Sequence, residues 1–155
     1  MEKVLDYLKK YNATSKIIEF EEEIPTVETA AKQIGCTPGE IAKSLSLKID
    51  DNTILIVMAG DQKIDNAKYK QEFGVKAKML DFDEVLPRIG HPVGGVCPFA
   101  VNENVKIYLD VSLKKYDIVY PACGKRNNAI KLTLKELEEI VKPNKWVDVS
   151  KPKEY

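Results

Sequence analysis

The chain has 155 residues and 17.5 kDa, the size of one ordinary domain that can bury a hydrophobic core without disulfides or metal. Hydrophobic residues make up 44% and charged residues 31% of it, which is typical of a water-soluble globular protein. With 24 basic and 24 acidic residues the net charge is zero, so no global field attracts the chain to nucleic acid or to a membrane. Any contact with a polyanion must therefore be local.

The few cysteine and histidine residues argue against several kinds of site. Cys36, Cys97 and Cys123 form no CxxC pair, and the N-terminal residues lack the apolar run of a signal peptide. We therefore expect a cytoplasmic protein with reduced thiols. The single histidine, His91, has no second histidine or cysteine at ligand spacing, which argues against a zinc site and against a Ser–His–Asp triad.

Apolar residues at helical spacing, together with capping residues, predict five helices. They cover residues 2–11, 26–35, 65–73, 81–86 and 133–140. Thr26 and Gly35 are a typical N-cap and C-terminal glycine, and Pro87 is expected to end the fourth helix. A helix-turn-helix motif is excluded, because residues 37–43 form a single capped turn that runs directly into an alternating strand.

Alternation of apolar and polar residues predicts seven strands and no internal repeat. The strands cover residues 15–20, 44–49, 53–58, 76–80, 105–109, 116–120 and 129–132. The second and third are separated only by residues 50–52, which is a hairpin signal. Helices and strands neither alternate strictly nor segregate, so the expected fold is a mixed α/β (α+β) domain with a largely antiparallel or mixed sheet and helices against it.

Residues 90–99, with the sequence GHPVGGVCPF, contain three glycines and two prolines. Gly94 and Gly95 can take positive φ and bring backbone N–H groups close to a ligand, while Pro92 and Pro98 stiffen the segment. The interpretation is a loop with buried walls whose backbone faces a pocket. An ordinary tight connection between two strands remains the alternative, because a glycine-rich turn is weak evidence by itself.

Three further positions carry candidate chemistry. Lys43 lies where the predicted helical turn enters a strand, so its amine is expected at the edge of an apolar site; the alternative is a surface lysine with a buried stem. Lys125 and Arg126 form either a small anion-binding group or a solvated turn. Cys97 is expected to be a buried small hydrophobe and not a nucleophile, because its neighbours in the sequence offer no base.

Four ordered blocks, taken together, resemble the YbaK and prolyl-tRNA-editing-domain family of aminoacyl-tRNA deacylases. The blocks are IAKSL at residues 41–45, GDQKID at 60–65, the loop at 90–99, and GKR at 124–126. They span nearly the whole chain, and this order and spacing is more specific than any one block. The resemblance implies a single editing domain over residues 1–155, with a barrel-like, mixed and largely antiparallel central sheet flanked by helices.

The resemblance also implies roles for residues of this chain. Lys43 matches the lysine that binds the aminoacyl end of the tRNA near the ester, and Gly95 belongs to the loop whose amides receive the aminoacyl carbonyl. The implied substrate-binding positions are Phe20, Ser44, Gly94, Val96, Cys97, Pro98, Gly124, Lys125 and Arg126. No metal, cofactor or protein nucleophile is implied, since an aminoacyl ester is already activated and its hydrolysis needs mainly positioning and charge stabilisation.

The function implied is trans-editing, with mischarged tRNA as substrate, prolyl-tRNA synthetase as a partner and no membrane contact. Cysteinyl-tRNA(Pro) is the first candidate substrate. However, Phe20 stands where the cysteine-specific members have a tyrosine and Ala129 where they have an aspartate, so the amino acid removed stays open. The competing hypothesis is a non-catalytic tRNA- or synthetase-binding accessory module. The zero net charge argues mildly against strong RNA binding by this chain alone.

Overall fold

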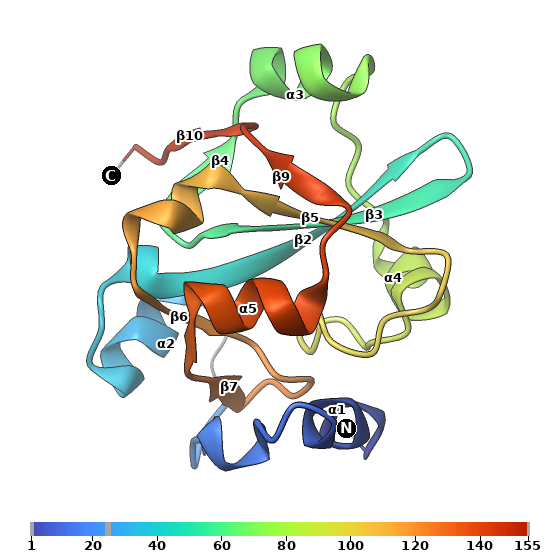
Figure 1. The fold of residues 1–155 in the computed structure, drawn as a ribbon. Helices are drawn as coiled ribbons and strands as arrows, with labels where there is room; N and C mark the ends of the chain where they lie inside the picture. The colour runs from blue at the N-terminus through green and yellow to red at the C-terminus, as the bar shows by residue number, and fades with distance from the viewer. Residues whose placement is uncertain (1, 24–25, 155) are drawn as a thin grey trace.

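The hairpin of β2 (Ile41–Ile49) and β3 (Asn52–Ala59) forms the centre of the computed structural model, which describes residues 2–23 and 26–154 (Figure 1). Within these residues, six strands form one curled sheet in the order β8-β6-β2-β3-β5-β9. The remaining four strands of this sheet are β5 (Lys106–Asp110), β6 (Ile118–Pro121), β8 (Leu132–Thr133) and β9 (Lys145–Val147). The predicted hairpin across residues 50–52 is thus confirmed.

The sheet is mixed. The pairs β2–β3 and β6–β8 are antiparallel, whereas β2–β6, β3–β5 and β5–β9 are parallel. Two small antiparallel pairs flank it, β1 (Ile17–Glu19) with β7 (Asn128–Ile130) and β4 (Gln62–Ile64) with β10 (Ser150–Pro152). The mixed α/β single domain is confirmed, with more parallel pairing in the main sheet than the sequence predicts.

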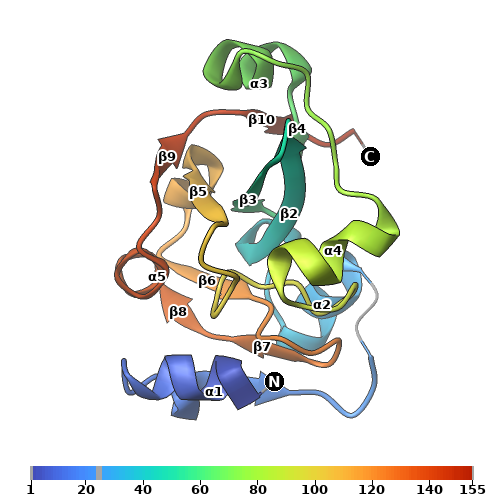
Figure 2. The same cartoon turned by 90° about the vertical axis from the view of Figure 1, so that its right-hand side faces the viewer.

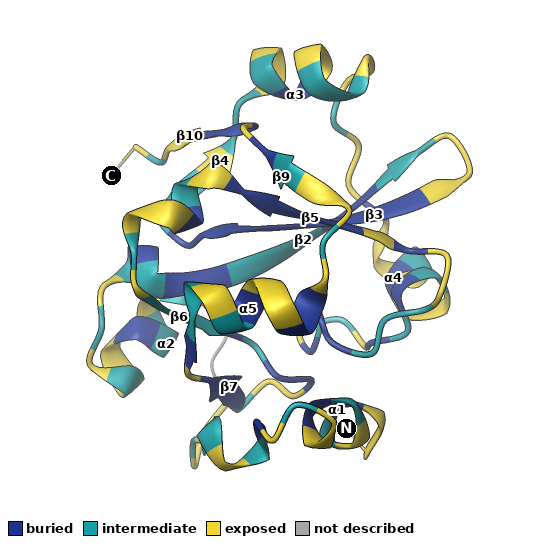
Figure 3. Ribbon diagram, in the orientation of Figure 1, coloured by how far each residue is buried: buried dark blue, intermediate teal, exposed yellow. Residues whose placement is uncertain are grey.

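Strand β3 is buried on both faces, because its apolar run Ile54–Met58 divides between two cores. Leu55 and Val57 belong to one cluster, while Ile54, Ile56 and Met58 belong to the other. Figure 3 shows this burial as dark blue along β3 and β5. Since side chains alternate along a strand, each neighbour of β3 also presents one residue to each core in turn.

The five predicted helices are all present in the described part of the chain. They are α1 (Glu2–Lys9), α2 (Val27–Ile34), α3 (Asn66–Phe73), α4 (Phe82–Ile89) and α5 (Leu134–Val141). Three short 3₁₀ turns each precede a strand: η1 (Thr14–Lys16) before β1, η2 (Pro38–Glu40) before β2 and η3 (Val111–Lys115) before β6. Figure 1 and Figure 2 show α1 and α3 at opposite ends of the molecule, with the sheet between them. None of the helices in the described ranges is long and apolar enough to cross a bilayer.

The caps of α2 are as predicted. The Thr29 N–H donates to Thr26 Oγ1 at 3.1 Å, and Gly35 ends the helix with φ of 84°. Helix α4 differs, because it passes through Pro87 and ends at Gly90. Val85 and Ile89 lie four residues apart on its buried face, and their burial offsets the hydrogen bond that proline removes.

Strand boundaries show the remaining differences. Residues 76–80 form no strand; only Met79 makes an isolated bridge, to Leu47. Strand β2 begins at Ile41, so Lys43 lies inside the strand and not at its entry. The predicted strand at 129–132 is divided into β7 and β8, while β4, β9 and β10, each of three residues, are missing from the prediction because such short segments have no periodicity of their own.

Candidate functional site

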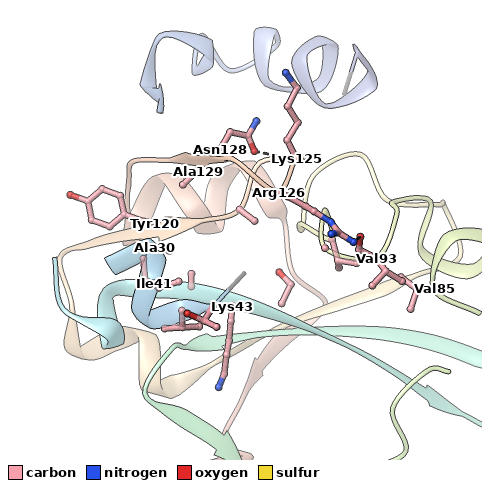
Figure 4. A pocket seen from close by; sticks show the side chains of 17 residues that line it. Ala30, Ile41, Lys43, Val85, Val93, Tyr120, Lys125, Arg126, Asn128 and Ala129 are labelled. Atoms are coloured by element: carbon pink, nitrogen blue, oxygen red, sulfur yellow. Dashed lines mark hydrogen bonds between the residues drawn. The ribbon is translucent and has the colours of Figure 1, made fainter. Parts of the chain in front are cut away.

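A cavity of about 350 Å³ lies between α2, α4, the start of β2 and the loops at residues 90–99 and 122–128 (Figure 4). Apolar side chains form most of its wall, among them Val27, Ala30, Val85, Val93, Val96 and Ala129. Lys43, Ser44, Gly94, Lys125 and Arg126 also line it. The structure therefore brings together six of the sequence-predicted site residues from three separate blocks of the chain. The volume of the cavity is at the lower end of the range for small-molecule sites.

Lys43 and Ser44 point to opposite faces of β2. Ser44 pairs with Val57, which belongs to the core cluster on the cavity side, and Lys43 pairs with Met58, which belongs to the other cluster. Lys43 Nζ donates to the carbonyl oxygens of Gly60, at 3.5 Å, and of Gln62. Figure 4 shows this ammonium directed away from Arg126. The lysine thus lies at the rim, and its amine must rotate to reach the middle of the cavity.

The environment of Lys43 disfavours its charged form. Burial and then the neighbouring Lys153 lower its pKa from 10.5 to about 8, while Glu28 and Asp61 act in the opposite direction. Lys153 is held nearby because its backbone N–H donates to Asp61 O at 2.9 Å. A measurable fraction of Lys43 is therefore neutral just above physiological pH, unlike an ordinary surface lysine.

Ser44 Oγ is buried and has no hydrogen-bond partner among the described residues. A buried hydroxyl without a partner costs about 1–3 kcal/mol relative to a satisfied one. Because Ser44 lines the cavity, a polar atom of a ligand could supply the missing partner.

The glycine loop turns at Pro92–Gly95, where the Gly95 N–H donates to Pro92 O at 2.9 Å. Gly94 is the third residue of this turn and has φ of 86°, the left-handed region that glycine adopts without strain. The predicted use of the Gly95 N–H as a donor to substrate conflicts with this bond. Gly94 and Val96, in contrast, donate their N–H groups to no acceptor within the described ranges, and both residues line the cavity.

A second loop, at residues 122–128, packs against the glycine loop. Asn128 braces it from inside, since its Oδ1 accepts from the Lys125 N–H at 3.1 Å and its Nδ2 donates to Cys123 O at 3.1 Å. Gly124 is buried with φ of 92°. Arg126 Nη2 donates to Val93 O at 3.3 Å and so joins the two loops directly.

Cys97 and Pro98, two predicted substrate-binding residues, lie outside this cavity. Cys97 is fully buried, and burial raises the pKa of its thiol to about 12. Its neighbours in the sequence offer no base, but in the folded chain His91 Nε2 lies 3.5 Å from its Sγ. That nitrogen lies 2.7 Å from Phe99 O, a bond in which it must be the donor, and so it cannot accept the thiol proton.

Pro98 instead lines a different hollow, together with Tyr7 and Val105. Phe20 is not among the residues lining the cavity, and its backbone pairs with Asn127 through a 2.8 Å bond to Asn127 O. No group of three or more His, Cys, Asp or Glu side chains suited to a metal ion occurs in the described part of the chain.

Comparison with known proteins assigns the family. A sequence model described as the aminoacyl-tRNA editing domain matches residues 21–140. The chain belongs to this family. The four blocks at residues 41–45, 60–65, 90–99 and 124–126 all lie within the matched region, and all but the 60–65 block contribute residues to the wall of the cavity. The resemblance found in the sequence is therefore confirmed.

Individual relatives differ in how much of their own length matches this chain. It is 49% identical to the uncharacterized protein YwhH of Bacillus subtilis (strain 168) over 97% of both chains. It is 30% identical to the proline–tRNA ligase of Kosmotoga olearia over 59% of this chain but only 16% of the ligase. A crystal structure described as that of a candidate trans-editing enzyme for prolyl tRNA synthetase superposes with a TM-score of 0.86 at 26% identity, over 97% of this chain and 96% of the other.

Several residues that line the cavity were not predicted from the sequence. The cavity is also lined by Val27 and Ala30 on α2, Val85 on α4, and Asn128 at the end of the 122–128 loop, which carries the cations Lys125 and Arg126. Val27 and Ala30 are three residues apart, so they share one helix face, which was the available signal for a buried surface. Nothing in the sequence shows that this face meets the glycine loop.

Proposed function

We propose that this protein is a trans-editing deacylase that hydrolyses the ester bond of a mischarged tRNA, with the whole 155-residue chain acting as one editing domain. The observation that supports this most is the cavity itself. Apolar walls, uncommitted backbone N–H groups and the cationic side chains of Lys125 and Arg126 meet in one place, with Lys43 at the rim, in a chain of the aminoacyl-tRNA editing family. An aminoacyl group esterified to a ribose needs these three kinds of partner.

In this proposal the amino acid occupies the apolar part of the cavity, and its carbonyl oxygen accepts hydrogen bonds from the Gly94 and Val96 N–H groups. Water adds to the carbonyl carbon, the negative charge develops on the oxygen, and the bond to the ribose oxygen then breaks as that oxygen takes up a proton. Donors already aimed at the developing charge contribute most to such a step. Gly95 supports the loop by its shape, because its own N–H is committed to Pro92.

Lys43 supplies positive charge near the ester once its ammonium turns from the Gly60 and Gln62 carbonyls towards the cavity. Lysine side chains rotate freely enough for this, and the partial burial of Lys43 strengthens its field at short range. For a cysteinyl substrate, the substrate's own thiol could attack its carbonyl in place of water, which needs no protein nucleophile. The burial of Cys97 is in accord with a mechanism without one.

Cysteinyl-tRNA(Pro) remains the first candidate substrate, with prolyl-tRNA synthetase as the partner that produces the error. The small apolar side chains around the cavity suit a small, uncharged amino acid. Ala129 lines it and is only 4% exposed, so the position offers a methyl group and no hydrogen-bonding carboxylate. Alanine and serine are accordingly the competitors to be compared with cysteine.

The test is multiple turnover. Catalytic amounts of protein are incubated with tRNA(Pro) charged with cysteine, alanine, serine or proline, and free amino acid is measured beyond one equivalent. We expect release of cysteine to be fastest and Lys43→Ala to lower it by about a hundredfold or more, the usual loss when a group that stabilises developing charge is removed. Absence of turnover on all four substrates, with and without prolyl-tRNA synthetase, overturns the proposal.

The second candidate function is a non-catalytic tRNA- or synthetase-binding module. The observation that favours it is the orientation of Lys43, whose ammonium contacts the Gly60 and Gln62 carbonyls outside the cavity. The same experiment separates the two functions, since a binding module protects at most one equivalent of charged tRNA and releases none.

A further inference from the structure

A second hollow, of about 500 Å³, adjoins the candidate site and is unused by the proposed reaction. Val93, Lys125 and Arg126 line both spaces, so these residues form the boundary between them. The second hollow is more polar, with Glu23 and Asn127 on its other side. A ligand held in the first cavity could therefore continue into the second past Arg126.

Arg126 is fixed at this boundary. Besides its bond to Val93 O, its side chain lies across Gly94, where a Cβ atom would be only 2.3 Å from Arg126 Nε. Glycine at position 94 thus makes room for the guanidinium. Such bracing lowers the entropic cost of holding the side chain in place for a ligand.

Each cation of this loop faces a carboxylate at a distance too long for a hydrogen bond. Arg126 Nη1 lies 3.7 Å from Glu23 Oε2, and Lys125 Nζ lies 3.7 Å from Glu19 Oε1. All four side chains are at least 44% exposed. Exposed pairs of this kind contribute little to stability, so a stronger anion can replace the carboxylates.

The backbone that carries the Glu19 carboxylate is paired with the segment that follows Arg126. Glu19 belongs to β1 and is paired with Asn128 of β7, and the next residue, Phe20, exchanges hydrogen bonds with Asn127 in both directions, at 2.8 and 3.0 Å. The backbone at Glu19 and Phe20 is therefore fastened beside Lys125 and Arg126. The nearby carboxylates oppose any anion that binds there, which weakens adventitious phosphate binding in a chain of zero net charge.

We propose that the second hollow binds a phosphodiester group at the 3′ end of the tRNA, with Arg126 and Lys125 as its partners. In the free protein Glu23 pairs with Arg126 where the phosphate binds. The proposal rests on the proposed function for the identity of the ligand. The ester and the nearest phosphate of a charged tRNA are attached to the same ribose, so adjoining sites suit them. Arginine matches a phosphate through two parallel N–H···O bonds, which a carboxylate at 3.7 Å does not provide here.

The experiment measures binding of a fluorescent RNA hairpin that carries the acceptor stem of tRNA(Pro) and an uncharged CCA end. Glu23→Gln should tighten binding roughly two- to fivefold, as expected for removal of an exposed ion-pair partner. Glu22→Gln is the matched control, because it removes the same charge from the neighbouring exposed residue, for which no ion pair occurs within the described ranges. Arg126→Gln should weaken binding and reduce the slope of log K against log salt by about 0.7–0.9.

Two further binding measurements test whether the effect of Glu23→Gln depends on Arg126 and on the CCA end. In the Arg126→Gln background, Glu23→Gln should tighten binding no more than Glu22→Gln does, since Glu23 then has no guanidinium to release and only its general repulsion of the anion is lost. With a hairpin that lacks the CCA nucleotides, Glu23→Gln and Glu22→Gln should behave alike. Equal tightening by both variants on the full hairpin overturns the proposal. So does an excess of tightening by Glu23→Gln over Glu22→Gln that persists without CCA or without Arg126.

Measuring deacylation of mischarged tRNA with the same protein preparations tests the phosphate site and the proposed function separately. If the binding results are as expected but no mischarged tRNA is turned over, the phosphate site stands and the catalytic proposal fails. If tRNA is deacylated while Glu23→Gln leaves hairpin affinity unchanged, the catalytic proposal stands and the phosphate site fails.

Discussion

The backbone of Gly95 lies directly against the carbonyl group of Gly124. A Cβ atom built on Gly95 would be 2.9 Å from Gly124 O and 3.3 Å from Pro92 Cγ. The two loops that form the candidate site are thus in contact at a point where only glycine fits, and the cavity depends on this contact for its shape.

Gly95→Ala should therefore act through loop separation and not by blocking a ligand. The obstacle is a backbone carbonyl, which cannot rotate away, so we expect the free energy of unfolding to fall by about 1–3 kcal/mol. The deacylation rate should fall by about a hundredfold, because the Gly94 and Val96 N–H groups shift with the loop. A thermal melt beside a single-turnover assay measures both effects. A variant with an unchanged melting temperature would show that the loops adjust without cost.

Lys43 makes stability depend on pH in a way that can be worked out. Its pKa in the folded protein is about 8, below the ordinary value of 10.5 that applies to the unfolded chain. Between these values the unfolded state binds more protons, so the folded state gains stability as pH rises from about 8 to 10.5. In Lys43→Met this gain should be absent. Urea unfolding at intervals from pH 7 to pH 10.5 measures the difference between the two proteins, and parallel curves would contradict the lowered pKa.

Lys153 should set the pH range of the reaction. After burial, it is the next contribution that lowers the pKa of Lys43, so Lys153→Met should raise that pKa. If the cationic form of Lys43 acts on the ester, the deacylation rate falls as pH rises through about 8 in the wild type, and falls at a higher pH in the variant. The profile is measured after subtraction of uncatalysed hydrolysis.

The matched control for this change is Lys151→Met, since Lys151 is an exposed lysine of β10, two residues before Lys153, and is not among the groups that shift the pKa of Lys43. Its profile should coincide with that of the wild type. A rate that rises through pH 8 would instead assign the active role to the neutral amine.

Local sequence signals predicted the parts of this fold that are fixed locally. Thr26 and Gly35 set the ends of α2 because capping depends on residues within one turn. In contrast, β9 and β10 form by pairing with strands about 37 and 88 residues away, and three residues show no periodicity. The candidate site also has one part that local sequence predicts and one that it does not. Alternation along β2 places Lys43 and Ser44 on opposite faces of the strand, but only the assembled fold shows which face borders the cavity.

Two interpretations of the loop illustrate what the sequence could not supply. The proximity of His91 to Cys97 depends on how the backbone folds between them, and the proton on His91 Nε2 depends on Phe99 O. In the same way, the commitment of the Gly95 N–H to Pro92 O follows from the turn, which the glycine and proline content predicts only in outline.

The cysteines should differ in reactivity. Burial raises the pKa of both Cys97 and Cys123 to about 12, whereas Cys36 is partly exposed. Iodoacetamide applied to the native protein should therefore modify Cys36 alone, as read by mass spectrometry of the peptides. Cys97→Ser should keep most of the deacylation rate while losing about 1–3 kcal/mol of stability, because a more strongly hydrated hydroxyl replaces a thiol at a fully buried position. Complete inactivation with the fold intact would revive Cys97 as a nucleophile.

Ser44→Ala should change stability and activity in opposite directions. Its Oγ is buried without a partner among the described residues, so its removal should leave the free energy of unfolding unchanged or raise it by up to about 1 kcal/mol. If the hydroxyl bonds to the substrate, kcat/KM should fall roughly two- to tenfold, the value of one neutral hydrogen bond. Ser46→Ala is the control, because Ser46 lies on the same face of β2 but does not line the cavity. A loss of stability in Ser44→Ala with unchanged kcat/KM would show that the hydroxyl serves the fold and not the substrate.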